Sequence, residues 1–527
     1  MGLAGILVAL GLLIWLSFRG WSILLLAPAA ALVAAGASGE PLLAHWTQTF
    51  MGGGAQFLAQ FFPLFLLGAL FGKLMEDSGS VEVIARFMTK KLGTGRAVVA
   101  VVLAGAIVTY GGVSLFVAIF VLVPMAQGLF RTADIPLRIM PAAIALGTMT
   151  FTMSALPGTP ALQNSIPMPF FGTTPFAAPG LGIIAAGIML SFGLWWLGRV
   201  EKAARRASEG YGKHDQAETP IDDGKLRERA SVASEFDPAE IPHGRHSETP
   251  PDVVVALLPL AVVILVNLAM SVVVLPRLDT SFLAEERWGA TSLAAVGGVW
   301  AVVVALLTAI LTLVALNYRR LPSLKASVDA GANASVLPAF SVASLVGFGA
   351  VIAALPAFTR VSDWVLSIEG GPLVSLAVAT NILAALTGSA SGGMTIALDT
   401  LGETYLRLAA EHGIEPALLH RVAVMSAGTL DSLPHNGAVV TLLAVCGVSH
   451  REGARVTNRA FRSGATIWAT VRPAPIANML EMTKLSMATV VALFNKPISM
   501  HTHHFEHVHA VEQPFLCYEE WKFFPIS

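Results

Sequence analysis

GGVSL at residues 111–115 interrupts an apolar stretch of this chain, and GGMTI at residues 392–396 interrupts a second stretch 281 residues later. Leu156-Pro157 within SALPGTPALQN (154–164) returns in the same way as Leu433-Pro434 within DSLPHNGAVV (431–440), 277 residues later. Non-helical backbone survives at membrane depth only where protein or a water-filled cavity satisfies its polar groups. A duplicated set of such breaks therefore predicts a ligand site of the kind that transporters carry.

Composition places the chain in a bilayer. Of its 527 residues 55% are hydrophobic and 13% are charged, too few charges to cover a soluble surface of this size. Apolar runs long enough to cross about 30 Å of hydrocarbon predict membrane spans at 4–18, 21–36, 54–73, 178–198, 252–276, 290–317 and 334–357. Nucleic-acid binding is not expected, and the absence of a G-x-x-x-x-G-K-[ST] motif argues against ATP hydrolysis.

A charged segment, residues 199–251, separates two apolar halves and is predicted to be a solvated linker. Its first basic residues, such as Arg199 and Arg205, put it in the cytoplasm by the positive-inside bias. The same bias puts Lys90 inside and the loop 277–287 outside, and Glu76 and Asp77 are expected at the cytoplasmic surface. The expected division is 1–44 (first transmembrane helices), 45–198 (first transport repeat), 199–251 (cytoplasmic linker), 252–329 (linking transmembrane helices), 330–450 (second transport repeat) and 451–527 (atypical tail).

Each half contains two interrupted segments. Residues 97–130 are too long for one crossing and break at 110–112, which predicts a re-entrant hairpin. Residues 139–172 contain four prolines, so they cannot form one continuous helix. The second half repeats both features, with breaks at 387–393 and 431–437. The predicted fold class is therefore an all-α polytopic membrane protein with two repeats, each with a hairpin and a broken helix.

Small hydroxyl and amide side chains gather at these four breaks. Hydroxyls and amides donate and accept hydrogen bonds in turn, which suits a hydroxy-acid substrate, and the amino ends of half-helices attract a carboxylate. The alternative is that these small residues only let helices pack closely. The candidate substrate-binding residues are Thr109, Gly111, Gly112, Ser114, Thr159, Gln163, Asn164, Ser389, Ser391, Gly392, Gly393, Thr395, Ser432 and Asn436.

Asp431 and His435 are ionisable groups inside an apolar run, and such groups are costly in a membrane and are functional candidates by default. Histidine exchanges protons near neutral pH, and a partly desolvated aspartate moves toward that range. Both are candidate proton-coupling residues. The alternative is that they cap the two half-helices.

The quoted breaks, together with GALFGKLMEDSGSVEVIARFMTKKLG (68–93), resemble the gluconate permease (GntP) family of the ion transporter superfamily. The resemblance covers residues 45–453. It implies an inner-membrane symporter of a bacterium for gluconate or a related small organic acid, coupled to protons or to Na⁺, with inverted-topology repeats and a homodimeric assembly. In the superfamily, ligand lies at paired hairpin tips and proline-containing broken helices, which map here to 111–114, 157–164, 389–395 and 432–436.

Two features depart from the family pattern. LPGTPALQN is less rich in histidine than the typical first broken helix, which leaves citrate-like and 3-hydroxybutyrate-like acids open as substrates. The family closes with an apolar helix, whereas the tail 451–527 is interrupted by charges, as a truncated or frame-altered end would be.

Other functions have weaker support in the sequence. A passive anion channel is the alternative within transport. An enzyme is not expected, because Ser432 near His435 is the only local pair that resembles a nucleophile and its base. No cofactor or metal is expected, since the histidine-rich run 501–509 has no accompanying ligand cluster.

Overall fold

The computed structural model describes residues 2–19, 21–211, 227–231, 236–368, 371–430 and 436–448, and within these ranges every regular element is helical. Six helical segments there are long and apolar enough to cross a membrane, and a seventh arises if the bent pair Ser80–Leu92 and Thr94–Tyr110 is one span. The six are Leu42–Asp77, Leu115–Thr132, Pro179–Arg206, Val253–Arg277, Leu293–Asn317 and Leu324–Ala354. The chain is therefore a multi-pass membrane protein.

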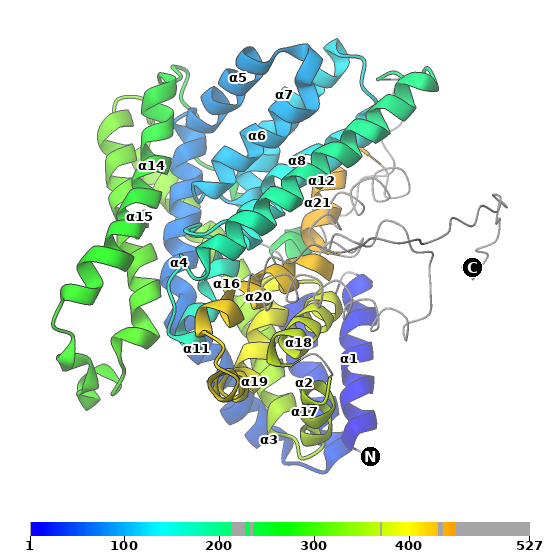
Figure 1. Ribbon diagram of the computed structural model, residues 1–527, viewed down its shortest axis with the longest axis vertical. Coiled ribbons are helices and arrows are strands. Elements are labelled where there is room, and N and C mark those ends of the chain that lie inside the picture. The colour runs from blue at the N-terminus through cyan, green and yellow to red at the C-terminus, as the bar shows by residue number, and fades with distance from the viewer. Residues whose placement is uncertain are drawn as a thin grey trace, which may run out of the picture.

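The helices form two series, one before and one after the charged segment (Figure 1). The first part of the chain forms α1 (Gly2–Phe18), α2 (Ile23–Ser38), α3 (Leu42–Ala44), α4 (Met51–Asp77), α5 (Ser80–Leu92), α6 (Ala97–Tyr110), α7 (Leu115–Thr132), α8 (Met140–Thr148), α9 (Phe151–Ser154), α10 (Leu162–Ser165), α11 (Pro167–Phe171) and α12 (Pro179–Arg206). After the charged segment come α14 (Val253–Ala269), α15 (Leu293–Asn317), α16 (Leu324–Ala354), α17 (Phe358–Leu366), α18 (Pro372–Thr387), α19 (Ala390–Glu411), α20 (Pro416–Leu430) and α21 (Gly437–Val445).

All seven predicted spans are helical. Some boundaries differ. The helical segment Leu42–Asp77 begins twelve residues before the predicted start at 54, α12 ends eight residues after 198, and α16 begins ten residues before the predicted start at 334. Its first residues are polar enough to hide the signal, but Ser323 caps the helix by accepting a hydrogen bond from the Ala326 N–H.

Helices α4 and α16 run antiparallel and pack closely through glycine. Gly54, near the start of α4, lies against Ala343 in the later part of α16, where an added Cβ would sit 3.1 Å from the Ala343 carbonyl oxygen. Gly331, near the start of α16, lies against Leu70 in the later part of α4. Small residues let two membrane helices approach closely, so this pair forms the centre to which the two series attach.

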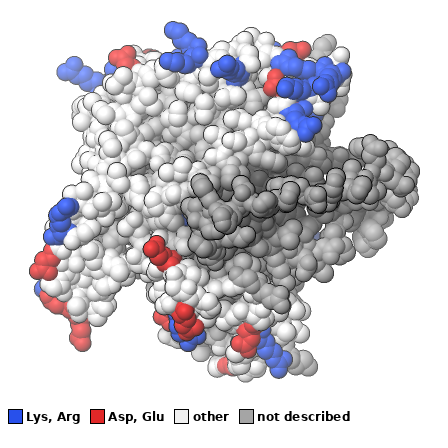
Figure 2. Space-filling model, in the orientation of Figure 1, with Lys and Arg blue, Asp and Glu red and all other residues white. Residues whose placement is uncertain are grey.

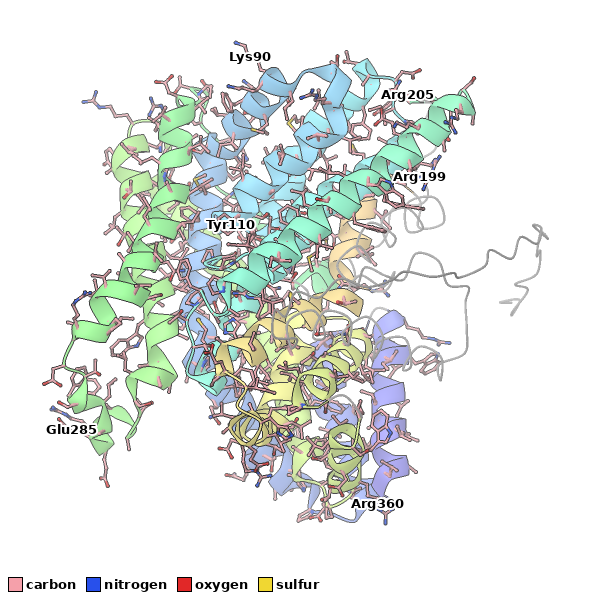
Figure 3. All side chains as sticks on the ribbon, viewed as in Figure 1. Lys90, Tyr110, Arg199, Arg205, Glu285 and Arg360 are labelled. Carbon is pink, nitrogen blue, oxygen red and sulfur yellow. The ribbon has the colours of Figure 1, made fainter. Side chains whose placement is uncertain are left out.

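Charge divides the molecule into two ends with an almost uncharged band between them (Figure 2). Lys90, Arg199 and Arg205 lie at one end, and Glu285 lies at the opposite end (Figure 3). The basic end contains the groups that the positive-inside bias assigns to the cytoplasm. Helix α5 lies at this end and α17 lies at the other (Figure 1).

The first hairpin turn matches the prediction, and the second lies at the start of its predicted range, 387–393, and is shorter. Helix α6 ends at Tyr110 and α7 begins at Leu115, with Gly112 between them at φ +97°. The second turn is Gly388-Ser389, with Gly388 at φ +64°. The sequence predicts Gly392 and Gly393 in the break, but both lie inside the first turn of α19.

Close packing is the physical reason for these two glycines. A Cβ on Gly393 would lie 2.3 Å from the Ala384 nitrogen of α18, and a Cβ on Gly392 would lie 2.8 Å from the Leu345 side chain of α16. At these two positions the helix-packing alternative explains the residue type.

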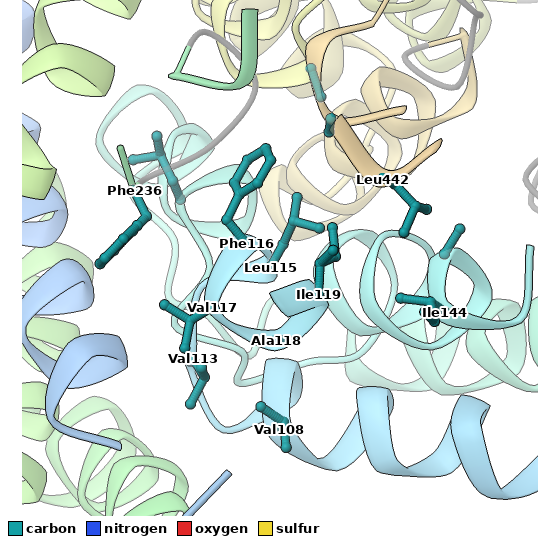
Figure 4. Packing of buried hydrophobic residues seen from close by; sticks show 14 of the residues in the cluster. Val108, Val113, Leu115, Phe116, Val117, Ala118, Ile119, Ile144, Phe236 and Leu442 are labelled. Atoms are coloured by element: carbon teal, nitrogen blue, oxygen red, sulfur yellow. The ribbon is translucent and has the colours of Figure 1, made fainter. Parts of the chain in front are cut away.

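A continuous apolar core surrounds the first hairpin. Phe116 and Ile119 of α7 belong to the same buried cluster as Leu442 of α21 and Phe236 of the charged segment (Figure 4). Residue 236 is fully buried. The part of the charged segment around it is therefore packed against the helices, which differs from the solvated linker that composition predicted.

The same segment covers a buried charge cluster at the basic end of α4. The Lys73 ammonium lies 3.1 Å from the Asp77 carboxylate and donates a 2.7 Å hydrogen bond to the Ile241 carbonyl. Asp77 accepts a 2.6 Å hydrogen bond from Ser327 of α16 and is fully buried, so its expected place at the surface is wrong. Buried charges are tolerated only when paired in this way.

Candidate substrate site at the hairpin turns and broken helices

Backbone carbonyls that the first broken helix leaves without a helical partner accept hydrogen bonds from side chains of other helices. The Tyr110 hydroxyl, at the end of α6, donates a 2.8 Å hydrogen bond to the Pro157 carbonyl. Asn267 of α14 donates a 3.1 Å bond to the Gly158 carbonyl, and the Gly158 N–H donates to Pro175. Tyr110 lies about midway between the two charged ends (Figure 3). Non-helical backbone is thus stabilised at membrane depth by protein partners.

The side chain of Asn164, a candidate substrate-binding residue, forms its hydrogen bonds within the broken helix and with α20. Its amide nitrogen donates to the carbonyls of Thr159 and Pro175, at 3.0 Å each. Its amide oxygen accepts a 3.0 Å hydrogen bond from Arg421 and lies 3.3 Å from the His420 ring. Both amide hydrogens are used, so Asn164 positions the broken helix in this conformation.

Arg421 and His420 of α20 are the site residues that sequence reasoning missed. The Arg421 guanidinium is fully buried and donates to the Ala177 carbonyl at 2.8 Å and to the Pro175 carbonyl at 3.3 Å. His420 shares a 2.6 Å hydrogen bond with the Thr173 hydroxyl. The signal was available, since an ionisable pair in an apolar segment is a functional candidate.

The charge of Arg421 has no acidic partner. Within the described part of the chain no carboxylate lies within 4.0 Å of its guanidinium. Neutral carbonyl and amide oxygens satisfy its hydrogen bonds and leave the positive charge uncompensated. In the low dielectric of the interior such a charge attracts an anion over a longer range than in water.

The first hairpin turn lies directly on the first broken helix. Thr109, Gly112, Ser114 and Ala161 line a cavity of about 20 Å³ between the two, enough for one water. A Cβ on Gly112 would meet the Pro160 ring at 2.7 Å, so only glycine fits this contact and this positive φ.

The remaining candidates of the first half differ in what they can offer a ligand. Thr159 accepts a hydrogen bond from the Ala161 N–H, and Ser114 caps α7 by accepting from the Phe116 N–H. Gly111 packs against Leu260 of α14. The side-chain oxygen of Gln163 is buried and accepts no hydrogen bond from any described residue. An unpaired buried acceptor is costly, which makes Gln163 the candidate most available to a ligand.

The second hairpin turn is tied to the second broken helix in a matching way. The Asn436 amide donates a 2.9 Å hydrogen bond to the Gly388 carbonyl, and its oxygen accepts a 2.7 Å bond from the Ala438 N–H at the start of α21. Ser389 caps α19 by accepting from the Gly392 N–H. Each half thus joins its hairpin turn to its own broken helix by a side chain.

The other second-half candidates lie on α19 or outside the described residues. Ser391 and Thr395 are buried on α19, and the Thr395 hydroxyl donates to the Ser391 carbonyl at 2.8 Å. Asp431, Ser432 and His435 lie outside the described residues, so their roles stay predictions. On the described side of this segment, α21 begins at Gly437 and Asn436 caps it.

The first broken helix packs against helices α19 and α20 of the second half. Ser154 of α9 lies against Gly428 of α20, where an added Cβ would sit 3.3 Å from the serine Cβ. Phe170 of α11 packs in a similar way against Gly402 of α19. The first broken helix therefore lies against the hairpin and the broken helix of the second half, as a shared site requires.

Comparison with known proteins agrees with this geometry. The sequence pattern of the GntP family permeases matches residues 1–173. The chain is also 40% identical over 462 residues to a Bacillus subtilis (strain 168) protein named "Uncharacterized transporter YxjC", and the match covers 86% of this chain and 94% of that protein. The chain belongs to the GntP permease family.

Membership confirms the resemblance inferred from the breaks. A GntP permease is a transporter, and the hydrogen-bonded breaks described above lie where a transporter of this kind needs irregular backbone. The family match spans α1 to α11 and so includes the first hairpin and the first broken helix.

Proposed function

We propose that this GntP permease is a secondary active transporter that carries gluconate or a related small hydroxy acid together with a proton across the bacterial inner membrane. The observation that carries the proposal is the contact of the first broken helix with α19 and α20 beside Arg421, whose charge has no acidic partner among the described residues. A buried positive charge favours an anionic substrate. Hydroxyls and amides at the turns suit a substrate with several hydroxyl groups.

Inverted-topology repeats of the ion transporter type are part of this proposal. Two observations support them: α4 and α16 run antiparallel, and α5 and α17, which follow these helices, lie at opposite ends of the molecule. In such a design one repeat moves against the other around a fixed site, which alternates access between the two sides. The proposed assembly is a homodimer.

Protonation supplies the driving force in this scheme. An aspartate or histidine in the second break, Asp431 or His435, takes up a proton and offsets the charge of the entering carboxylate. A neutral loaded site crosses the apolar interior at lower cost than a charged one.

Uptake by the purified protein in proteoliposomes tests the proposal. Labelled gluconate, 3-hydroxybutyrate and citrate are offered separately under an inward proton gradient or an inward Na⁺ gradient. The proposal expects accumulation of gluconate above the external concentration under the proton gradient only. Equilibration without accumulation would instead indicate a passive channel, and accumulation driven by Na⁺ alone would overturn proton coupling.

A further inference from the structure

A polar cavity lies between α4, the first broken helix and the second hairpin. Its volume is about 180 Å³, and its polar lining consists of Gln56 and Gln60 from α4 and of Thr395 and Asp399 from α19. Phe57, Phe61, Phe170 and Val346 are among the residues that complete the wall. Gln56 belongs to the first part of α4, a helix that begins in the half of the molecule opposite the basic end (Figure 1).

The polar groups of this cavity are not used by the fold. Within the described ranges, the side chains of Gln56, Gln60 and Asp399 make no hydrogen bond or ion pair, whereas the Thr395 hydroxyl donates to its own helix. Asp399 is exposed in the cavity. A lone carboxylate facing two amides in an apolar wall is costly for a membrane protein and indicates a function.

The repeat shows that the architecture does not require a carboxylate at this position. The two repeat spacings, 277 and 281, place the first-half equivalents of Asp399 at Leu122 and Ala118. Both are fully buried in the core around the first hairpin. The acidic group is therefore a feature of the second half alone, as a group that faces one side of the membrane must be.

No other titratable side chain lines this cavity. Within the described part of the chain, α4 contributes amides and phenylalanines, α11 contributes Pro169 and Phe170, and α16 contributes Val346. The next acidic residue of α19 is Glu403, one turn further on and exposed. The charge of Asp399 therefore changes when its carboxylate gains or loses a proton, and no neighbouring ion pair in the cavity controls that step.

We propose that Asp399 binds the coupling proton before it reaches the second break, with Gln56 and Gln60 holding the carboxyl group. A hydronium ion transfers one proton to the carboxylate, which becomes a neutral carboxylic acid, and one water is released. A glutamine amide donates to a carboxylate and accepts from a carboxylic acid, so the same two residues serve both states. Neutralisation then lets the second hairpin move along the phenylalanine wall of α4 without desolvating a charge.

This inference rests on the proposed function, and one experiment separates the two. Wild type, Asp399→Asn, Asp399→Glu and the control Glu403→Gln are reconstituted as full chains, after size-exclusion chromatography has shown that each is monodisperse. Labelled gluconate is followed in two modes: accumulation under an inward proton gradient, and exchange against internal gluconate without a gradient. Infrared spectra of the same samples are titrated with pH to follow the protonated carboxyl band.

We expect Asp399→Asn to lose gradient-driven accumulation, to retain exchange and to lose one protonated carboxyl band. Asp399→Glu should recover part of the accumulation, and Glu403→Gln should match wild type in all three readouts. Accumulation at the wild-type level in Asp399→Asn, or an unchanged carboxyl band, would overturn the proposal. If wild type moves no gluconate in either mode, the proposed function fails, and the carboxyl band still decides whether Asp399 binds a proton.

Discussion

Replacement of Arg421 by methionine removes the side chain that joins α20 to the first broken helix. Its guanidinium donates to Ala177, Pro175 and Asn164, but these acceptors are not equally dependent on it. Pro175 also accepts from Gly158 and Asn164, and Asn164 also contacts His420. Only the Ala177 carbonyl loses its sole side-chain donor among the described residues.

The expected loss of stability follows from that count. One buried carbonyl without a donor costs about 1–3 kcal/mol, and weakening of the two shared contacts brings the total to about 2–4 kcal/mol. Removal of an unpaired buried charge offsets part of this cost. Arg421→Met should therefore unfold at a clearly lower temperature than wild type, as measured by thermal aggregation of the purified protein in detergent.

The charge has a separate effect on substrate binding. For a carboxylate about 10 Å from the guanidinium, an effective dielectric constant of about 20 gives an attraction of about 1.7 kcal/mol, or about 17-fold in affinity. Arg421→Lys keeps the charge but offers a single nitrogen in place of the guanidinium fork. It should therefore recover gluconate affinity more than stability, whereas a methionine variant with wild-type stability and affinity would refute this account of Arg421.

Three further predictions concern the hairpins and the second break. Among the described residues, Tyr110 is the only side-chain donor to the Pro157 carbonyl. Tyr110→Phe should therefore lower the free energy of unfolding by about 1 kcal/mol, while an unchanged melting temperature would show that water replaces the hydroxyl. Asp431→Asn should reduce gradient-driven accumulation more than exchange. Asn436→Ala should impair both, because it frees the second hairpin turn. If Asp431→Asn affects accumulation and exchange equally, Asp431 is only a helix cap. Cysteines at Ser114 and Thr395 should react from opposite sides of the membrane, and labelling of both from the same side in every state would rule out inverted repeats.

Hydropathy and proline pattern predicted most of the helices, because a membrane span and a proline break are local properties of the sequence. The second hairpin turn lies within its predicted range, 387–393, but Gly392 and Gly393 serve the contact of α19 with α18 and α16. A glycine that permits a turn and a glycine that permits close packing look the same in a sequence.

The residues that were missed depend on distant partners. Arg421 is held by carbonyls more than 240 residues away in the chain, and no local pattern encodes that contact. Asp77 appeared to be a surface residue because its cover comes from the charged segment, whose composition is typical of solvated linkers. Asp399 lies in a helix of mixed composition, where a single acidic residue is unremarkable until the cavity beside it is known.

The most direct test of the central claim is the proton movement that gluconate itself induces. Proteoliposomes containing the wild-type chain and an internal pH-sensitive dye are prepared without any gradient, and gluconate is then added outside. A symporter must acidify the lumen as substrate enters, and empty liposomes must not respond. Entry of labelled gluconate without acidification would contradict proton symport, and the absence of both entry and acidification would contradict the proposed substrate.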